Sequence, residues 1–174
     1  MDDIQIKLIE AFAYILERKP FDCIKPAEVA EVAGVEESVF AFHFKDIYEA
    51  ADALLREESD AVATSGIKPE TGGEAFLLSA SFVLRFPESA KHLCLSSGGG
   101  IYKKYVSSLA GKCFSEVVLA KLGDKTPGER ERCAVKFLRA AATGLASREL
   151  VAAKDPRAAA EQYTDFFDEI TDKL

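Results

Sequence analysis

Residues 29–44 constrain the fold of this chain more than any other part of the sequence. Apolar residues recur at helical spacing as far as Ala33, Gly34 interrupts the pattern, and a second periodic stretch then reaches Phe44. Glycine readily adopts the left-handed conformation in which many helices end. Two short helices joined by a tight turn with glycine form a helix-turn-helix motif, and the second helix of such a pair enters the DNA major groove.

The sequence around this motif resembles the N-terminal domain of TetR-family transcriptional regulators over residues 4–50. An amphipathic first helix with Ile4 and Ile15 precedes the turn Lys19-Pro20-Phe21-Asp22, and Ala33-Gly34-Val35 follows. The segment Phe40-Ala41-Phe42-His43-Phe44-Lys45 is similar to the family's Leu-Tyr-x-His-Phe followed by Lys. The resemblance covers the first third of the chain by motif, and the remainder by length and helical pattern.

Helical periodicity and the positions of Gly and Pro predict an all-α fold with about nine helices, which agrees with the resemblance. In that fold, residues 1–46 form a three-helix helix-turn-helix domain that binds DNA, and residues 47–174 form a helical domain for effector binding and dimerisation. The implied function is a ligand-responsive regulator, a repressor that releases DNA when a small apolar effector binds. The side chains that the resemblance places at the double-stranded DNA operator are Lys25, Glu36, Glu37, Ser38, Phe42, His43 and Lys45.

The charge of the predicted recognition helix departs from the family. Glu36 and Glu37 stand where the family usually has a small hydroxyl residue and a basic or small residue, and Ala41 replaces a tyrosine that reaches a phosphate. The first fifty residues carry five Lys and Arg against eleven Asp and Glu, a net charge of −6 out of −7 for the whole chain. Lys and Arg supply most of the non-specific affinity for DNA, so this acidity opposes DNA binding.

Two functions therefore stay open. A glutamate can accept a hydrogen bond from cytosine N4, so a DNA-binding regulator with a changed target fits the motif. The alternative is a TetR-like dimer with weakened or lost DNA binding that acts as a ligand-binding or protein-interaction module. The helix-turn-helix pattern favours the first function, and the charge of residues 1–50 favours the second.

Glycine and proline divide the rest of the chain into further helices. Asp46 is placed to cap a helix over residues 47–63, and residues 65–73 have the composition of a loop. Thr126-Pro127 and Asp155-Pro156 each combine a capping residue with a proline suited to the first helical position. After the helix over residues 47–63, the predicted helices span residues 74–86, 88–95, 101–122, 127–153 and 156–174.

The middle helices carry aromatic and polar residues that are typical of an apolar effector pocket. Pockets combine apolar walls with a few polar groups, and Arg85 and His92 are candidates for the polar groups. Plain core packing is the alternative role for each aromatic residue. The predicted ligand-binding residues are Phe82, Phe86, His92, Tyr102, Tyr105, Phe114 and Phe137, with Phe76, Leu93 and Cys94 nearby on the same helices.

The last two predicted helices have the composition of a dimer interface. Small residues such as Ala141 allow helices to approach closely, and apolar residues of the final helix are spaced to form a stripe. Packing within the chain's own core is the alternative. Adjacent Phe166 and Phe167 point in different directions, so one can face the core and the other a partner. The predicted interface consists of Ala141, Leu145, Tyr163, Phe166, Phe167 and Ile170.

Other classes of protein find little support in the sequence. The chain has two distant histidines and no nucleophile elbow, paired metal ligands or nucleotide fingerprint, so we expect no enzymatic activity, no metal and no cofactor. It has no apolar run long enough for a membrane span, and its acidic start argues against a secretory signal, so we expect a cytoplasmic protein.

We expect Cys23, Cys94, Cys113 and Cys133 to be reduced and mostly buried, although a redox pair of Cys94 with Cys113 or Cys133 is an alternative.

Overall fold

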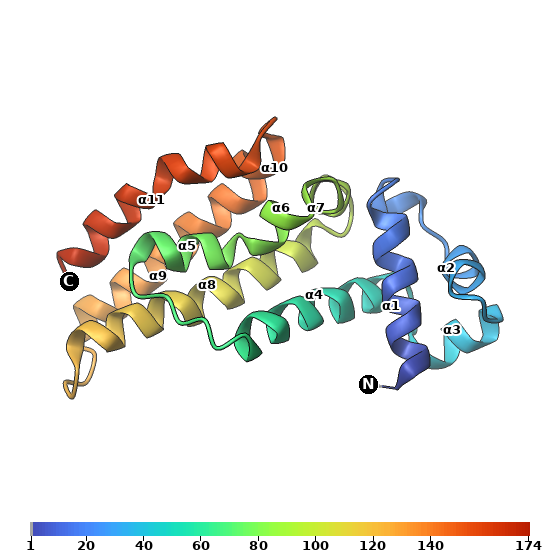
Figure 1. The fold of residues 1–174 in the computed structure, drawn as a ribbon, viewed down its shortest axis with the longest axis horizontal. Coiled ribbons are helices and arrows are strands. Elements are labelled where there is room, and N and C mark those ends of the chain that lie inside the picture. Colours follow the sequence, from blue (N-terminus) through green and yellow to red (C-terminus); the bar gives the residue numbers. More distant parts are fainter. Residues whose placement is uncertain (1) are drawn as a thin grey trace.

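The computed structural model describes residues 2–174, and this part of the chain is helical without a strand. A small unit of α1 (Asp3–Leu16), α2 (Pro26–Ala33) and α3 (Glu37–His43) lies at one end of an elongated bundle, and α4 (Ile47–Thr64) runs from that unit along the bundle (Figure 1). The other helices are α5 (Gly72–Ser79), α6 (Ser81–Arg85), α7 (Pro87–Cys94), α8 (Gly99–Leu122), α9 (Glu129–Gly144), α10 (Leu150–Ala152) and α11 (Pro156–Asp172). The predicted all-α fold is confirmed.

Several helix ends lie where the capping residues and glycines of the sequence predicted them. Gly34 ends α2 in the left-handed region with φ of 71°, and the Val35 N–H then donates to the Ala30 carbonyl at 3.0 Å. The Asp46 carboxylate accepts a hydrogen bond from the Glu49 N–H at 3.0 Å and caps α4. Asp155 caps α11 in the same way, with Pro156 at the first helical position. These ends depend on short-range hydrogen bonds, which explains why the sequence predicted them.

Two predicted helices differ from the structure. The helix predicted over residues 74–86 is two helices, α5 and α6, because the chain bends at Ala80. The buried Ser79 hydroxyl donates to the Phe76 carbonyl at 2.7 Å, a contact of the kind that bends helices. The start predicted at Thr126-Pro127 is also wrong, since the backbone is still extended at Gly128 and α9 begins at Glu129.

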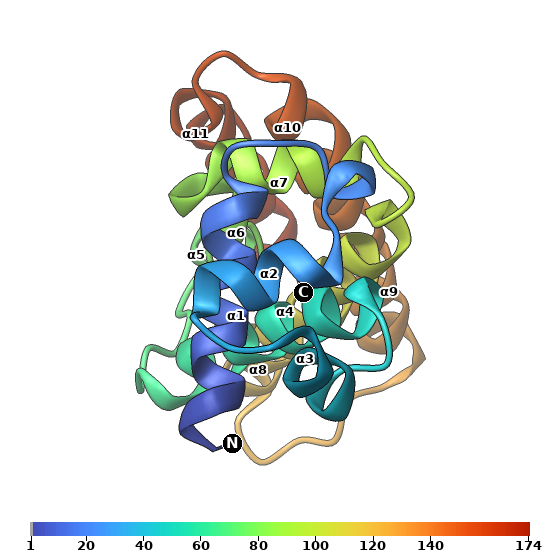
Figure 2. The same ribbon diagram turned by 90° about the vertical axis from the view of Figure 1, so that its right-hand side faces the viewer.

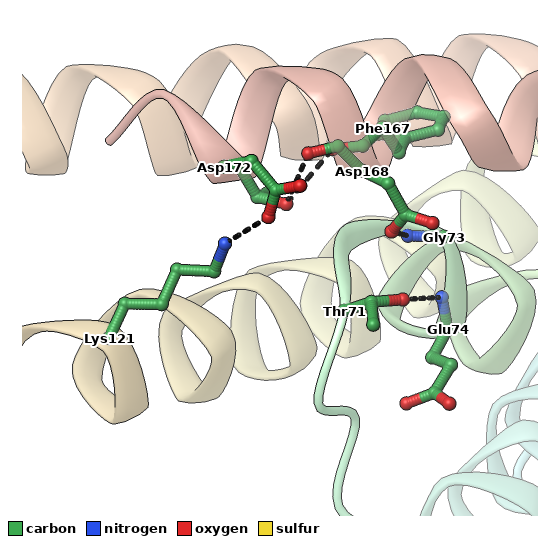
Figure 3. Close-up of polar contacts among 8 residues, drawn as sticks. Thr71, Gly73, Glu74, Lys121, Phe167, Asp168 and Asp172 are labelled. Carbon is green, nitrogen blue, oxygen red and sulfur yellow. Dashed lines mark hydrogen bonds and ion pairs between the residues drawn. The ribbon is translucent and has the colours of Figure 1, made fainter.

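The start of α5 is packed directly against α11, as Figure 3 shows. Thr71 caps the helix by accepting from the Glu74 N–H at 3.2 Å, and the Gly73 N–H donates to the Asp168 carboxylate at 2.6 Å. A Cβ atom on Gly72 would overlap the Phe167 carbonyl oxygen. The predicted loop over residues 65–73 therefore ends early, because α11 holds residues 72 and 73 in the first turn of α5.

A continuous apolar core connects the N-terminal unit with the bundle. In the bundle, the Phe167 ring stacks on Phe76 and Phe114 with centroid distances of 4.6 and 5.3 Å. Such aromatic pairs contribute roughly 0.5–1.5 kcal/mol each beyond the apolar area that they bury. Within residues 2–174, no helix is both long enough and apolar enough to cross a membrane.

Candidate functional site

The helix-turn-helix lies at the free end of the molecule, with α2 and α3 in front of the bundle in Figure 2. Buried Phe40 and Phe44 anchor α3, and their rings lie 5.5 Å apart. Phe42 lies two positions after Phe40, which is about 200° around the helix, so it points away from Phe40 and is 84% exposed. The packing of α3 therefore turns its polar residues and Phe42 to solvent.

Six of the seven predicted DNA-binding residues are exposed in the helix-turn-helix and its flanks. His43 is the exception, because its side chain is mostly buried and its Nδ1 lies 3.9 Å from an Asp2 carboxylate oxygen. The Phe42 ring packs edge-on against the His43 ring at 5.2 Å. The predicted residues that are exposed are Lys25, Glu36, Glu37, Ser38, Phe42 and Lys45.

This surface is acidic. Residues 25–45 contain two lysines against four glutamates, a net charge of −2. Of the four, Glu28 forms an ion pair with Lys19, whereas Glu31, Glu36 and Glu37 have no ion-pair partner within residues 2–174. Their charges therefore remain available to an incoming molecule.

Polar contacts connect the N-terminal unit to the loop between α7 and α8. The Asp22 carboxylate accepts hydrogen bonds from the Ser97 N–H at 3.2 Å and from the Ser97 hydroxyl. That hydroxyl also lies 2.8 Å from the Tyr48 hydroxyl, and His92 Nδ1 lies 2.7 Å from the Leu16 carbonyl oxygen. We call the Asp22–Ser97 contact the latch. It was not predicted from the sequence, where its only signal was the aspartate in the turn of residues 19–22.

An aromatic cluster occupies the interior between α6 and α8. The Phe82 ring lies 6.0 and 6.1 Å from the Tyr102 and Tyr105 rings, and 5.5 Å from the partly exposed Phe86 ring. The Tyr102 hydroxyl donates to the Ala146 carbonyl at 3.5 Å. The structure therefore groups four of the seven predicted ligand-binding residues.

Buried polar groups lie beside this cluster. The Tyr105 hydroxyl is buried without a hydrogen-bond partner, as is the Ser81 hydroxyl. Burial raises the pKa of Tyr105 to about 12, and Ser81 lies close enough to oppose the rise, although the two oxygens do not meet hydrogen-bond geometry. Glu58 forms an ion pair with Arg85 nearby, and burial raises the pKa of Glu58 while Arg85 opposes it.

The other three predicted ligand-binding residues lie elsewhere, which corrects the expectation of one shared chamber. Phe114 is fully buried against Phe167, where it packs the core beneath α11. Phe137 is 58% exposed on α9, because the buried side of that helix carries Leu138 and Ala142. His92 lies at the junction with α1.

An open groove of about 640 Å³ offers a more accessible site for a small molecule. Its apolar wall includes Leu77, Leu78 and Leu84, and Arg85 and Arg157 stand at its edge with acidic residues. Ser81, whose hydroxyl is buried without a hydrogen-bond partner, also lines it. A smaller hollow of about 160 Å³ borders Phe82, Phe86 and Glu58.

A π-helical segment, Leu145–Glu149, interrupts the long helix formed by residues 129–152. The Ala146 carbonyl accepts from the Tyr102 hydroxyl, and the Ser147 carbonyl accepts from the Cys94 thiol at 3.0 Å. Burial raises the pKa of the Cys94 thiol. Single π-helical turns occur frequently at functional sites. Its two hydrogen bonds join this segment to α7 and α8, and the segment also lies at the surface beside α9 and α11.

The predicted dimer residues surround an open hollow of about 690 Å³ between the end of α9, the π-helical segment and α11. Phe166 is 54% exposed there, and Ala141, Leu145 and Tyr163 are half-buried around it. Ile170 is half-buried further along α11. Phe167 is 1% exposed, because its ring is stacked in the core, so the structure leaves Phe166 and not Phe167 for a partner.

The cysteines differ from the prediction in their burial. Cys23 and Cys133 are exposed, Cys94 is half-buried and Cys113 is buried. All four are free thiols, and burial raises the pKa of Cys113 to about 11. The expectation of mostly buried thiols is therefore wrong for two of the four.

Two solved structures share this fold over nearly the full length of the chain. The dihydroxyacetone kinase operon activator DhaS has a TM-score of 0.73 at 10% identity, covering 98% of this chain and 95% of DhaS. The TetR family repressor AlkX from Dietzia sp. strain DQ12-45-1b, implicated in biodegradation of n-alkanes, has a TM-score of 0.57 at 15% identity, covering 98% and 96%. No protein-family model matches the sequence, and no curated protein matches it. The chain has a TetR-like fold.

Proposed function

We propose that this chain is a ligand-responsive transcriptional regulator of the TetR type that works as a cytoplasmic homodimer without enzymatic activity. The observation that carries the proposal is the exposed α3 of a helix-turn-helix at the free end of a TetR-like fold. Residues 1–46 are the DNA-facing domain, and residues 47–174 are the effector-binding and dimerisation domain. The comparison proteins are described as an activator and a repressor; for this chain we propose repression, relieved by an effector.

In this proposal the DNA contacts are few. Lys25 and Lys45 flank the helix-turn-helix and contact phosphates, while Ser38 and the exposed glutamates face the bases. A two-fold dimer through the Phe166 surface supplies a second recognition helix for a palindromic operator. Because only two lysines are available on residues 25–45, we expect weak binding with a shallow dependence on salt.

The effector site in this proposal is the groove beside α5 and α6. Its leucine side chains suit a small apolar molecule, and Ser81 is a polar residue of the same lining. Arg85 at its edge is held by Glu58 of α4. A molecule that displaces this ion pair changes how α4 packs on the bundle, and α4 leads directly to the helix-turn-helix. The latch between Asp22 and Ser97 is a second connection to the same unit.

A charge swap on the recognition helix tests DNA binding. Replacing Glu36 by Ser and Glu37 by Lys removes two negative charges and adds one positive charge. Each additional phosphate that the protein neutralises steepens the log–log salt dependence by about 0.9. We expect tighter binding of a non-specific duplex at low salt, measured by gel shift, with the upstream DNA of the gene as the specific probe. The control makes the same charge change at the exposed Asp124, just after α8, and Glu129, the first residue of α9.

The second candidate function is a TetR-like dimer that has lost DNA binding and serves as a ligand-binding or protein-interaction module. The specific observation in its favour is the unpaired acidic surface of α2 and α3. The charge-swap experiment separates the two functions. Nanomolar binding of the upstream DNA by the wild-type protein in physiological salt, weakened by the swap, identifies the glutamates as base readers and rejects the second candidate.

A further inference from the structure

The exposed side of α2 and α3 combines an apolar centre with unpaired negative charge. Phe42 is 84% exposed, the largest exposed fraction among the large apolar side chains of residues 2–174, and Val32 is 47% exposed. Glu37 is exposed on the same seven-residue helix, five positions before Phe42. We call the exposed side chains Glu31, Val32, Glu36, Glu37 and Phe42 of the helix-turn-helix the acidic face.

Electrostatics narrows the occupants that this face can take. Nucleic acid and anionic lipid carry the same sign of charge as the face, so both are repelled from it at low salt. A second copy of the chain is repelled as well, since the whole chain carries −7 and its own helix-turn-helix is acidic. A protein surface rich in Lys and Arg is the complementary occupant.

The exposed phenylalanine specifies a second property of the partner. Aromatic side chains are enriched among the residues that dominate binding energy at protein interfaces, where they fill desolvated pockets. Buried Phe40 and Phe44 hold the helix that carries Phe42, so little conformational freedom of the helix is lost on binding. A partner with an apolar pocket for one aromatic ring, surrounded by basic residues, fits both features.

We propose that the acidic face is a docking site for a second protein, which presents basic residues around an apolar pocket and occupies the position of operator DNA on the helix-turn-helix. This inference rests on the second candidate function, the protein-interaction module. In this inference, the glutamates attract the partner protein and exclude DNA from the same surface.

The test uses full-length protein and a dye-labelled synthetic helical peptide with lysine on one side and leucine on the other, as a model of the partner surface. Fluorescence anisotropy gives its Kd at low and at physiological salt, beside a labelled 24-base-pair duplex. We expect Phe42→Ala and the double change Glu36→Gln with Glu37→Gln each to weaken peptide binding about tenfold. A peptide with serine in place of leucine should bind at least tenfold more weakly.

Matched controls remove similar groups elsewhere. Leu95→Ala removes a 72% exposed apolar side chain, and Asp124→Asn with Glu129→Gln removes two exposed charges; both should leave the Kd unchanged. Equal peptide binding by all variants overturns the docking site. Tighter binding of the duplex than of the peptide also overturns it, and in that case supports the DNA-binding function. If neither probe binds, the docking site is overturned, whereas the proposed dimer and the proposed effector groove are not affected by that result.

Discussion

The buried hydroxyl of Tyr105 leads to a quantitative prediction about the interior between α6 and α8. This oxygen is inaccessible to solvent and has no hydrogen-bond partner within residues 2–174. An unsatisfied buried polar group costs about 1–3 kcal/mol. Tyr105→Phe removes that group while keeping the ring that packs on Phe82. We therefore expect the variant to be at least as stable as the wild-type protein at pH 7.

The pH dependence follows from the same hydroxyl. Burial raises the pKa of Tyr105 from 10.0 to about 12, so the neutral phenol is favoured in the folded state. The associated stability is present below pH 10 and is lost as the pH rises from 10 to 12, because the unfolded chain then ionises first. A shift of two pKa units corresponds to about 2.7 kcal/mol in full, of which about half, or 1.4 kcal/mol, is lost at pH 11.

Urea unfolding followed by circular dichroism at pH 7 and pH 11 measures both effects. The wild-type protein should lose about 1.4 kcal/mol more than Tyr105→Phe between these two values, and taking the difference between proteins cancels the ionisation of other groups. Tyr102→Phe is the control at pH 7, because its hydroxyl has a hydrogen bond to the Ala146 carbonyl and its removal should destabilise. A loss of more than about 1 kcal/mol at pH 7 in Tyr105→Phe would refute the reasoning, since it would mean that the hydroxyl has a partner.

Three further predictions concern packing, assembly and coupling. Gly72→Ala should lower the free energy of unfolding by about 1–3 kcal/mol in urea titration, because a Cβ there overlaps the backbone of α11, whereas Gly100→Ala, with open space around it, should not destabilise. Phe166→Glu should convert a dimer into a monomer in light scattering at micromolar concentration, and an unchanged mass would contradict the proposed interface. Asp22→Ala removes the acceptor for both Ser97 donors, so amide hydrogen exchange should accelerate in α1 while α8 to α11 stay protected.

The sequence predicted those parts of the fold that depend on near neighbours. Gly34 ends a helix in the left-handed region, and Asp46 and Asp155 cap helices, through hydrogen bonds that span a few residues. The burial of Phe40 and Phe44 on one side of α3, with Phe42 on the other, also follows from helical periodicity. All of these features can be recognised in a single sequence, because their partners lie within one or two helical turns.

Features that depend on distant partners were not predictable in the same way. The latch joins residues 75 positions apart, and the Gly73–Asp168 hydrogen bond joins residues 95 positions apart. The π-helical segment is stabilised by Tyr102 and Cys94 from other helices. The predicted ligand-binding residues are not all brought together, for a related reason. Aromatic composition does not show which side of a helix is buried until the neighbouring helices are known, and Phe114 is in the core whereas Phe137 is exposed.

The helix-turn-helix shows how fold and partner are encoded by different residues of one short helix. Phe40, Phe44 and Gly34 fix the position of α3, and none of them is altered by the charge of the exposed side. Glu36 and Glu37 lie at the start of α3, where acidic side chains interact favourably with the helix dipole, so they cost the fold nothing while they oppose the approach of phosphates. A TetR-like scaffold can therefore keep its recognition helix and change its partner, since a fold alone does not determine function. The exposed side chains of α3 decide which partner binds, and the charge swap and the peptide titration measure that choice directly.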